Sequence, residues 1–440
     1  MLKRKVYDRL LEWKRRSDAT CLLVRGPRQV GKTFIIEAFG KAEYDNYVYV
    51  NFIKFPRAKG AFSDDLDIDG IMAELSLRLR DVRYSPGNTL LFLDEIQECP
   101  LARTALKMFA LDGRYDVIAS GSLLGLHFKN AKNAPTPVGY EEIIEMRAMD
   151  FEEFLWAMGR DSKAVDYYRN AVRDRRPLGA SASALDDLFR DFTMVGGMPA
   201  VVEKFAGGCG YRRAWEMNQS ILGTYMDDID RYTSGKIERN KTRSCMRSVP
   251  EQLATPNRKF FYSKVDGDTK NGSRKFRNGV NWLIDAGMVL PCHRLTEPKA
   301  FLEENVDEDV FKVYMHDTGL LMSMYDFSAM ELVFDEDADV KVGAVTENCV
   351  AACIDRAGKV PYYFEKKSKL EIDFVEYTKA GVAAIEVKSG ENRTSKSLDA
   401  LEENGYKAGA RIKLEHGDIW TDDDGILHLP LWAAGFFSDI

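Results

Sequence analysis

Two hydrophobic periodicities alternate along the first third of the chain. Mostly apolar, β-prone runs occur at residues 21–24, 47–52, 90–93, 115–119 and 143–148. Between these runs, apolar residues recur every three or four positions, which is the spacing of amphipathic helices. The predicted helices cover residues 6–13, 71–79, 102–111 and 150–158, with another directly after Thr33. Strands that alternate with helices predict an α/β fold with a parallel sheet covered on both faces.

The middle of the chain has mainly helical periodicity. Apolar positions repeat at helical spacing over residues 180–206 and 211–232, and the sequence GGMP at 196–199 is expected to break the first stretch. Residues 231–277 are rich in lysine and arginine, and a β-like run follows at 288–295. This pattern predicts a helical region that ends in helix, turn and strand.

The last hundred residues combine one helical stretch, at 345–354, with several β-like runs. Residues 362–390 are expected to form strands joined by a turn at 379–381, which makes a β-hairpin. The acidic segment 335–339 is typical of a linker. These changes of pattern predict three domains, which cover residues 1–160, 161–335 and 336–440.

A glycine-rich turn follows the first predicted strand. Gly26 to Thr33 reads G-x-x-x-x-G-K-T, the pattern of a Walker A phosphate loop. Glycines let the backbone wrap closely around phosphate oxygens, and the next helix points its first N–H groups at the anion. Lys32 is expected to reach the β- and γ-phosphates, and Thr33 to hold Mg²⁺. The flanking strand and helix disfavour the alternative of a turn that binds nothing.

Two carboxylates end the apolar run at 90–93. A buried parallel strand delivers the side chains at its carboxyl end to the edge where α/β sheets bind ligands. Asp94 is expected to act through the Mg²⁺ shell as the Walker B aspartate. Glu95 is expected to polarise the attacking water as general base. The predicted catalytic residues are therefore Glu95 and Lys32, and the predicted metal ligands are Thr33 and Asp94.

A further polar group, Ser120, ends the run at 115–119. It is expected either to touch the γ-phosphate or the water, or to belong to a simple turn. The polar segment 127–137 is expected to form a mobile loop near the nucleotide. The complete set of predicted nucleotide-binding residues is Gly26, Pro27, Arg28, Gln29, Val30, Gly31, Lys32, Thr33, Phe34 and Ser120.

Five segments together resemble a family of bacterial and archaeal AAA-like ATPases. They are GPRQVGKT, LLFLDEIQ, IASGSLLGL, MDFEEFL and GGMPAVV. The resemblance implies a P-loop NTPase core of the ASCE, AAA-like type, a middle region with a winged-helix element, and a C-terminal restriction-endonuclease-like α/β domain. The chain departs from the family at Gly139 and Tyr140, where many members have Gly-Arg. Arg28 and Arg147 are the nearest substitutes for a sensing arginine.

The winged-helix resemblance gives the basic middle region a candidate role. It implies that Lys275 and Arg277 lie on or beside a recognition helix that contacts DNA. The alternatives are a solvated basic surface and a module that packs against protein.

A second set of chemical groups lies in the predicted C-terminal hairpin. Glu386 and Lys388 are two apart on a strand, so they share a face, and Asp373 on the preceding strand can join them. Carboxylates are hard ligands suited to Mg²⁺, and Glu347 could complete the site from its helix. The set is similar to the D…E-x-K signature of restriction-endonuclease-like nucleases. Such folds often lose catalysis, so an inert module is the alternative.

Composition narrows the functional classes further. The 440 residues carry a net charge of -7, so any contact with nucleic acid must rest on a local basic patch. The seven cysteines form no C-x-x-C pair, and no run of 18 apolar residues occurs. We therefore expect a cytoplasmic protein with reduced cysteines and no membrane contact.

These patterns together predict an ATP-binding and ATP-hydrolysing enzyme that uses Mg²⁺ and couples hydrolysis to DNA binding or processing. One alternative is an ATP-dependent switch that binds a protein partner and carries an inert nuclease-like module. Another is an ATP-regulated, metal-dependent DNA nuclease. Oligomerisation is compatible with each of these interpretations, and the sequence identifies no arginine finger.

Overall fold

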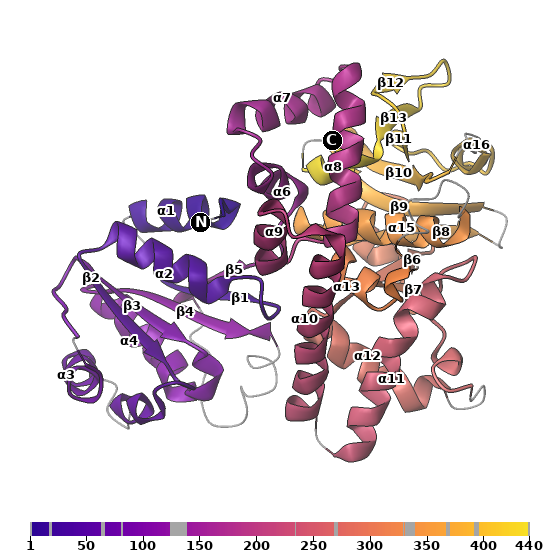
Figure 1. Ribbon diagram of the computed structural model, residues 1–440. Coiled ribbons are helices and arrows are strands. Elements are labelled where there is room, and N and C mark those ends of the chain that lie inside the picture. The colour runs from indigo at the N-terminus through magenta and orange to yellow at the C-terminus, as the bar shows by residue number, and fades with distance from the viewer. Residues whose placement is uncertain are drawn as a thin grey trace. The chain divides into compact units, whose positions relative to one another are not determined.

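The structure is a computed structural model that describes residues 2–16, 20–62, 67–80, 82–123, 139–233, 235–267, 272–328, 330, 339–366, 370–390 and 396–438. It has two compact units (Figure 1). The N-terminal unit comprises Lys3–Arg147 with Asp285–Gly287, and the C-terminal unit comprises the other residues. The division into three domains stays a prediction. The segments expected to form a mobile loop, at 127–137, and most of an acidic linker, at 335–339, lie outside the described residues.

The N-terminal unit is built from alternating strands and helices, as the hydrophobic pattern predicted. Its elements are α1 (Lys5–Arg15), β1 (Cys21–Gly26), α2 (Lys32–Glu43), β2 (Asn46–Asn51), α3 (Ile68–Arg78), β3 (Thr89–Asp94), η2 (Ile96–Glu98), α4 (Pro100–Asp112), β4 (Asp116–Ser122) and β5 (Glu141–Glu145). The last strand was expected to reach residue 148 and ends earlier, because the backbone beyond Glu145 forms other hydrogen bonds.

The five strands form one parallel sheet in the order β2-β3-β4-β1-β5. Strand β4 lies between β1, which leads into the phosphate loop, and β3, which ends in Asp94. Because parallel strands end at the same edge, this order gathers the loop, Asp94 and Ser120 at one edge. The α/β fold class with a core of P-loop NTPase type is therefore confirmed.

Alternate side chains of these strands fill the two sides of the sheet. On one side, β1 and β3 residues such as Leu23 and Leu93 pack with α3 and α4 residues such as Met72 and Leu106. Helices α1 and α2 lie on the other side (Figure 1). Strand β3 is buried along its whole length, which fits its unbroken apolar run.

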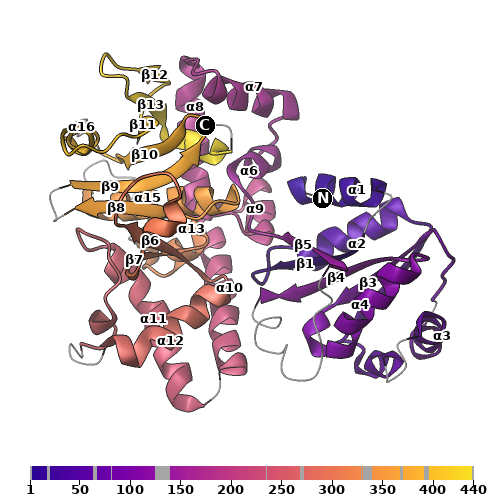
Figure 2. The same cartoon turned by 180° about the vertical axis from the view of Figure 1, so that it is seen from behind.

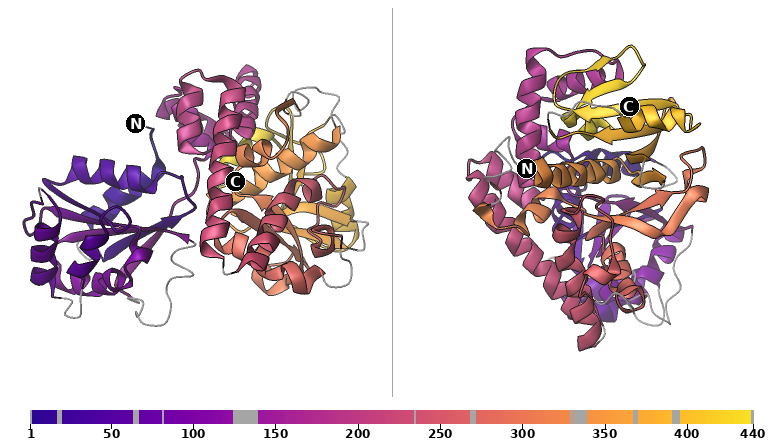
Figure 3. Two further views of the ribbon diagram at one scale, coloured as in Figure 1. Left: turned by 60° about the horizontal axis from the view of Figure 1, so that its bottom comes forward. Right: turned by 90° about the vertical axis from the view of Figure 1, so that its right-hand side faces the viewer.

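The C-terminal unit begins with helices and ends in a mixed sheet. Its helices are α6 (Phe151–Ala157), α7 (Ser162–Arg173), α8 (Ala180–Val195), α9 (Pro199–Ala206), α10 (Gly210–Tyr232), α11 (Lys236–Leu253), α12 (Gly272–Asp285), α13 (Thr318–Ser323), α15 (Asp339–Arg356) and α16 (Lys396–Glu403). Its strands are β6 (Val289–Leu295), β7 (Val306–Met315), β8 (Tyr362–Lys366), β9 (Leu370–Thr378), β10 (Gly381–Val387), β11 (Ala410–Glu415), β12 (Trp420–Thr421) and β13 (Leu427–Pro430). The long helix α10 runs beside α11 and α13 (Figure 3).

The sheet of this unit has eight strands in the order β12-β13-β11-β10-β9-β8-β6-β7. Helix α15 packs against β6, β7 and β10, and α16 packs against β9 and β10 (Figure 2). The predicted hairpin is confirmed, since β9 and β10 pair antiparallel and Thr378 faces Gly381 across the turn. Strands β6 and β7 pair antiparallel after α12, and β6 also pairs in parallel with β8. One sheet thus contains strands from the middle and the end of the chain.

Candidate functional site

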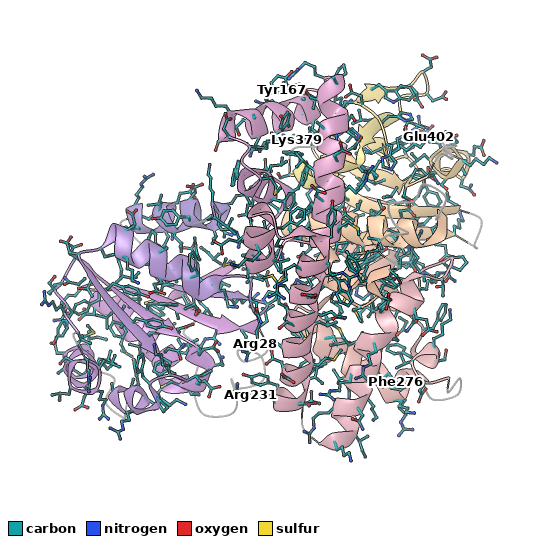
Figure 4. The ribbon with its side chains drawn as sticks, viewed as in Figure 1. Arg28, Tyr167, Arg231, Phe276, Lys379 and Glu402 are labelled. Carbon is teal, nitrogen blue, oxygen red and sulfur yellow. The ribbon has the colours of Figure 1, made fainter. Side chains whose placement is uncertain are left out.

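The phosphate loop joins β1 to α2 and has the backbone shape that its glycines allow. Gly31, which precedes α2, has a φ of 93°, a left-handed conformation that favours glycine. A Cβ atom on Gly26 would lie 2.0 Å from the carbonyl oxygen of Met146, so only glycine fits there. Arg28 lies in this loop (Figure 4). The loop therefore needs both glycines for reasons that are visible in its own packing.

Lys32 is the first residue of α2 and bends back over the loop. Its Nζ donates hydrogen bonds to the carbonyl oxygens of Gly26, at 2.9 Å, and Pro27, at 2.7 Å. Burial lowers the pKa of Lys32 to about 8, although the carboxylates of Glu95 and Asp94 oppose the shift. A phosphate would be a stronger acceptor than these two neutral carbonyls, because it is charged.

Asp94 is the centre of the hydrogen-bond network at the carboxyl edge of the sheet. Its Oδ2 accepts bonds from Thr33 Oγ1 at 3.2 Å and from Tyr49 Oη at 3.0 Å. Asn51 Nδ2 donates to the same oxygen at 2.9 Å. Oδ1 accepts from Ser120 Oγ at 2.5 Å and from the backbone N–H of residue 95 at 3.1 Å. Each of these donors is neutral, so the charge of the buried carboxylate stays available to a cation.

Two of these partners, Tyr49 and Asn51, were missed by sequence reasoning. Both lie on β2, which the predicted strand 47–52 already contained. Strand β2 pairs with β3 in a register that places Asn51 beside Asp94. A polar residue at the end of an otherwise apolar strand was the available signal. It became meaningful only when the order of the strands was known.

Glu95, the predicted general base, follows β3 directly. Its backbone is left-handed, with a φ of 55°, which is uncommon for a residue other than glycine. Its Oε2 accepts a hydrogen bond from Gln97 Nε2 in the short helix η2. The left-handed turn directs the chain away from β3, and Gln97 holds the carboxylate. Such local strain is common at functional sites.

The remaining predicted nucleotide-site residues have varied environments. Ser120 is 1% exposed and contacts Asp94, whereas Phe34 is 59% exposed. Gln29 has a left-handed backbone, with a φ of 64°. The backbone carbonyl of Val30 accepts a bond from Arg4, and Arg147 pairs with Glu145. Ser120 is therefore a member of the Asp94 network, although the pattern alone did not exclude a simple turn.

The donors around Asp94 fit a magnesium ion. Thr33 and Asp94 supply a hydroxyl and a carboxylate, hard oxygen ligands of the kind that Mg²⁺ takes together with phosphates and water. The neutral partners of Asp94 leave its negative charge uncompensated by a side-chain cation in the described network. A bound Mg²⁺ would supply that positive charge, and Thr33 and Asp94 would hold it.

The second predicted constellation lies at the carboxyl end of β10. The register that pairs Ile385 with Phe374 places Glu386 opposite Asp373. The backbone N–H of Val387 donates to Asp373 Oδ2 at 2.8 Å. Lys388 Nζ lies 2.7 Å from Glu386 Oε1. Burial, together with the charge of Glu347, raises the pKa of Asp373 to about 7. The structure thus brings Asp373, Glu386 and Lys388 together.

Glu347 lies on α15 and is already bonded by cations. Its Oε1 accepts from Lys312 Nζ at 3.0 Å and from the hydroxyl of Tyr314, and its Oε2 pairs with Arg258 at 2.5 Å. Burial would raise the pKa of Glu347, but Lys312 and Arg258 outweigh it and hold this pKa below its usual value. Lys312 also lies 3.0 Å from Glu371.

These cations come from outside the predicted C-terminal domain. Lys312 is on β7, and Arg258 follows α11 in a left-handed conformation with a φ of 49°. In the described part of the chain, no three His, Cys, Asp or Glu side chains are grouped so that they could hold a metal ion. Glu386 Oε2, in a side chain that is 3% exposed, has no hydrogen-bond partner among the described residues.

The predicted DNA-contacting residues lie on one helix. Lys275 and Arg277 are on α12, which is followed by the antiparallel pair β6 and β7. Lys275 forms an ion pair with Asp266, and Arg277 forms one with Asp309 at 2.5 Å. Both pairs are partly or largely exposed, and such pairs contribute little to stability.

The geometry of the Asp94 network agrees with the comparison of the chain with protein families. Residues 18–155 match the family model described as AAA domain. The N-terminal unit therefore carries an AAA-type P-loop domain. Residues 186–331 and 342–433 match two further models, described as Domain of unknown function (DUF8612) and Domain of unknown function (DUF4143). The restriction-endonuclease-like character of the C-terminal part stays a prediction.

Several solved structures are distantly similar to the chain. The ORC2 protein of Aeropyrum pernix in ADPNP–ADP complexes is 12% identical, over 78% of this chain and 91% of that chain, with a TM-score of 0.33. The Aeropyrum pernix ORC1 protein in complex with DNA is 12% identical, over 76% and 91%, with a TM-score of 0.28. AMPPCP-bound DnaA of Aquifex aeolicus is 12% identical, over 64% and 86%, with a TM-score of 0.27. No function is transferred from similarities this low.

No curated protein matched the sequence. None of the helices in the described part of the chain combines the length and the apolar character needed to span a membrane.

Proposed function

We propose that the AAA domain binds ATP with Mg²⁺ and hydrolyses it. The observation that carries this proposal is the Asp94 network, in which a buried carboxylate has only neutral partners and lies beside the hydroxyl of Thr33. Lys32 would bind the β- and γ-phosphates, and the loop N–H groups would surround them. Glu95 would accept a proton from the attacking water, and Ser120 would hold Asp94 in place.

A pair of glutamine variants tests the hydrolysis. Glu95→Gln keeps the size and polarity of the side chain but removes the base. We expect ATP affinity within about threefold of the parent and turnover lower by at least about 100-fold. Glu98→Gln, in the same short helix η2 as Gln97, is the matched control and should retain turnover. Hydrolysis that survives Glu95→Gln would refute the assigned base, and Lys32→Ala should abolish turnover.

The energy of hydrolysis is proposed to serve DNA binding or processing by the C-terminal unit. The support is helix α12, which carries Lys275 and Arg277 and precedes a β-hairpin, an order of elements that winged helices share. Their ion pairs with Asp266 and Asp309 are exposed enough to exchange for phosphate contacts.

A salt-dependent gel shift on duplex DNA tests this coupling. The double variant Lys275→Gln/Arg277→Gln should weaken binding and reduce the dependence of log affinity on log salt concentration by about two contacts. Arg190→Gln/Arg213→Gln is the matched control, since both arginines are exposed and paired with neighbouring carboxylates. A parent protein that fails to bind DNA at low salt would leave the protein-partner switch as the better interpretation.

A second function, metal-dependent DNA cleavage, is favoured by one observation. Glu386 Oε2 is buried without a hydrogen-bond partner among the described residues, opposite Asp373 and next to Lys388. A buried carboxylate oxygen of this kind is costly unless a cation or proton satisfies it. Asp373 and Glu386 would hold a divalent cation, and Lys388 would orient water or stabilise developing charge.

Plasmid nicking tests this second function. We expect cleavage with Mg²⁺ or Mn²⁺ that is lost in both Asp373→Ala and Lys388→Ala. Asp399→Ala, at an exposed carboxylate on α16, is the control and should cleave as the parent does. A parent protein that is inert with both metal ions would exclude the nuclease.

A further inference from the structure

The GGMP segment between α8 and α9 is shaped by close contacts at both of its glycines. A Cβ atom on Gly196, whose φ is 77°, would lie 2.1 Å from Asp317 Oδ1. A Cβ atom on Gly197 would lie 2.1 Å from the backbone oxygen of Met149. Separations under 3.0 Å do not occur for real side chains. The two glycines therefore permit contacts that no other residue would allow, which a simple helix break does not require.

Asp317 is the buried centre to which this turn is tied. Its Oδ2 accepts from the backbone N–H of Gly197 at 2.7 Å and pairs with Arg356 at 2.6 Å. Its Oδ1 accepts from the backbone N–H of Leu320 at 3.2 Å and so caps α13. The side chains of Arg356 and Asp317 are 3% and 0% exposed. A buried pair of this kind depends on its geometry, because neither charge can fall back on water.

Neighbouring polar side chains fix the same segment from other helices. Asn348 of α15 bonds both the N–H and the carbonyl of Met315, at 2.7 Å and 3.1 Å. Tyr225 of α10 bonds His316 Nε2 at 3.0 Å. We call Gly197, Asp317, Asn348 and Arg356, with the backbone they hold, the Asp317 hub. It joins the α8–α9 turn to α13 and α15 within the C-terminal unit.

Residues 146–149 form the connector between the last strand of the AAA sheet and this hub. On its N-terminal side, the N–H of Met146 donates to the carbonyl of Arg25 at 2.7 Å, and its own carbonyl abuts Gly26. On its C-terminal side, the N–H of Met149 donates to the carbonyl of Gly197 at 2.7 Å. A short segment bonded at both ends is stiff, unlike a solvated linker.

Arg4 adds a direct tie between the connector and the phosphate loop. Its guanidinium donates to the carbonyl of Val30 at 3.0 Å and to the carbonyl of Arg147 at 2.8 Å. The side chain is buried, so its two bonds are not readily replaced by water. A displacement of Val30 in the loop would thus change a bond to the connector.

The phosphate loop contains the group that can drive such a displacement. Lys32 Nζ donates to the carbonyls of Gly26 and Pro27, and phosphates would compete for these same hydrogens. Exchange of the acceptor alters the bonding of Gly26, which abuts Met146. A ligand shifts a conformational equilibrium only through contacts that differ between two states, and Lys32 supplies such a difference.

We infer that connector 146–149 transmits the occupancy of the phosphate loop to the Asp317 hub. Nucleotide binding changes the bonds of Lys32, the change reaches Met146 and Arg147 through Gly26 and Arg4, and Met149 carries it to Gly197. The helices α13 and α15 therefore sense the nucleotide from within the C-terminal unit. This inference rests on the proposed binding of ATP and goes beyond it, since it assigns a role to GGMP and to Arg4.

Hydrogen exchange of the full chain tests the inference. The probe is the non-hydrolysable analogue AMPPNP with Mg²⁺, at a concentration that saturates binding measured separately by fluorescence titration. We expect amide exchange in peptides covering residues 193–202 and 315–323 to change by at least about threefold, besides the change at the phosphate loop. If AMPPNP binds and these peptides exchange as before, the inference is overturned. If AMPPNP does not bind, the proposed function fails first.

Gly197→Ala separates transmission from binding. The added methyl group collides with Met149, so the variant should bind AMPPNP within about threefold of the parent and lose the response of the hub peptides. Gly223→Ala is the matched control, because a Cβ there meets nothing within 4 Å. Where Gly197→Ala fails to melt cooperatively, Arg4→Gln gives the same test from the other end of the connector. A hub response retained in the folded variant would contradict the inference.

Discussion

Asp94 in the AAA domain and Glu347 in the C-terminal unit are both buried carboxylates, but their partners have opposite character. Asp94 is bonded by hydroxyl, amide and backbone donors, which are neutral. Glu347 is bonded by Lys312 and Arg258, which neutralise it within the protein. A carboxylate with neutral donors is fixed in position and retains its charge for an exchangeable cation. One with built-in cations has its charge compensated and holds elements of the fold together.

The largest expected effect comes from breaking the compensated site. Lys312→Met leaves Glu347 buried with one cation fewer, and we expect the free energy of unfolding to fall by about 3–5 kcal/mol. Chemical denaturation followed by circular dichroism measures it. Lys299→Met, at an exposed pair with Glu297, should change stability by less than about 0.5 kcal/mol.

A double variant checks the cause of this loss. Lys312→Met combined with Glu347→Gln removes both charges, and we expect it to recover at least half of the lost stability, since coupled residues are not additive. A double variant no more stable than Lys312→Met would contradict the charge argument.

The matching change in the neutral site should act on catalysis instead of stability. Asp94→Asn keeps the size of the side chain but removes the charge that would hold Mg²⁺. We expect ATP turnover to fall by at least about 100-fold, with a change in unfolding free energy below about 2 kcal/mol. Steady-state phosphate release and urea unfolding measure the two quantities. Near-normal turnover in this variant would remove Asp94 from the metal site.

His316 extends the comparison to a buried group that is uncharged. It bonds Tyr225, and Asp317 and Arg356 flank it. Burial lowers the pKa of His316 to about 4, against about 6.5 unfolded. Because the folded pKa is the lower one, the unfolded state takes up the proton first. Stability is therefore retained above pH 6.5 and lost as the pH falls toward 4.

The size of this effect is measurable at mild acidity. At pH 5, His316 should lower the free energy of unfolding by about 2 kcal/mol relative to pH 7. Denaturation at both pH values should show this difference in the parent, and His316→Asn should reduce it. An unchanged pH dependence in His316→Asn would assign the acid sensitivity to other groups.

The smallest expected effect concerns a partner of Asp94. Asn51→Ala removes one donor to Oδ2 while Thr33, Tyr49 and Ser120 remain, so we expect turnover to fall by about tenfold with ATP affinity unchanged. Asn46→Ala, at the start of the same strand, is the control for strand stability. A loss of ATP affinity equal to the loss of turnover would show that Asn51 acts on the nucleotide site as a whole.

Several parts of the AAA site followed from local sequence. The loop from Gly26 to Thr33 is continuous in sequence, and its backbone shape depends on its own glycines. Asp94 and Glu95 follow directly from the apolar run of β3, since a buried parallel strand ends at the ligand edge. The hairpin of β9 and β10 was predictable for the same reason, because alternation and a short turn act over neighbouring residues.

The partners of those residues were not accessible in the same way. Tyr49 and Asn51 reach Asp94 because β2 lies beside β3 in the sheet order. Lys312 and Arg258 reach Glu347 because β7 joins the C-terminal sheet and α15 packs against it. Pairings between distant segments depend on strand order and helix packing, which a single sequence does not display.

The sequence by itself determined the α/β core, the phosphate loop and the carboxylates at the strand ends, since these depend on residues close together in the chain. Only the tertiary structure decided which donors surround Asp94, which cations compensate Glu347, and that GGMP meets Asp317 and Met149. The reason is physical: a buried charge takes its properties from whatever packs around it, and packing joins residues that are far apart in sequence.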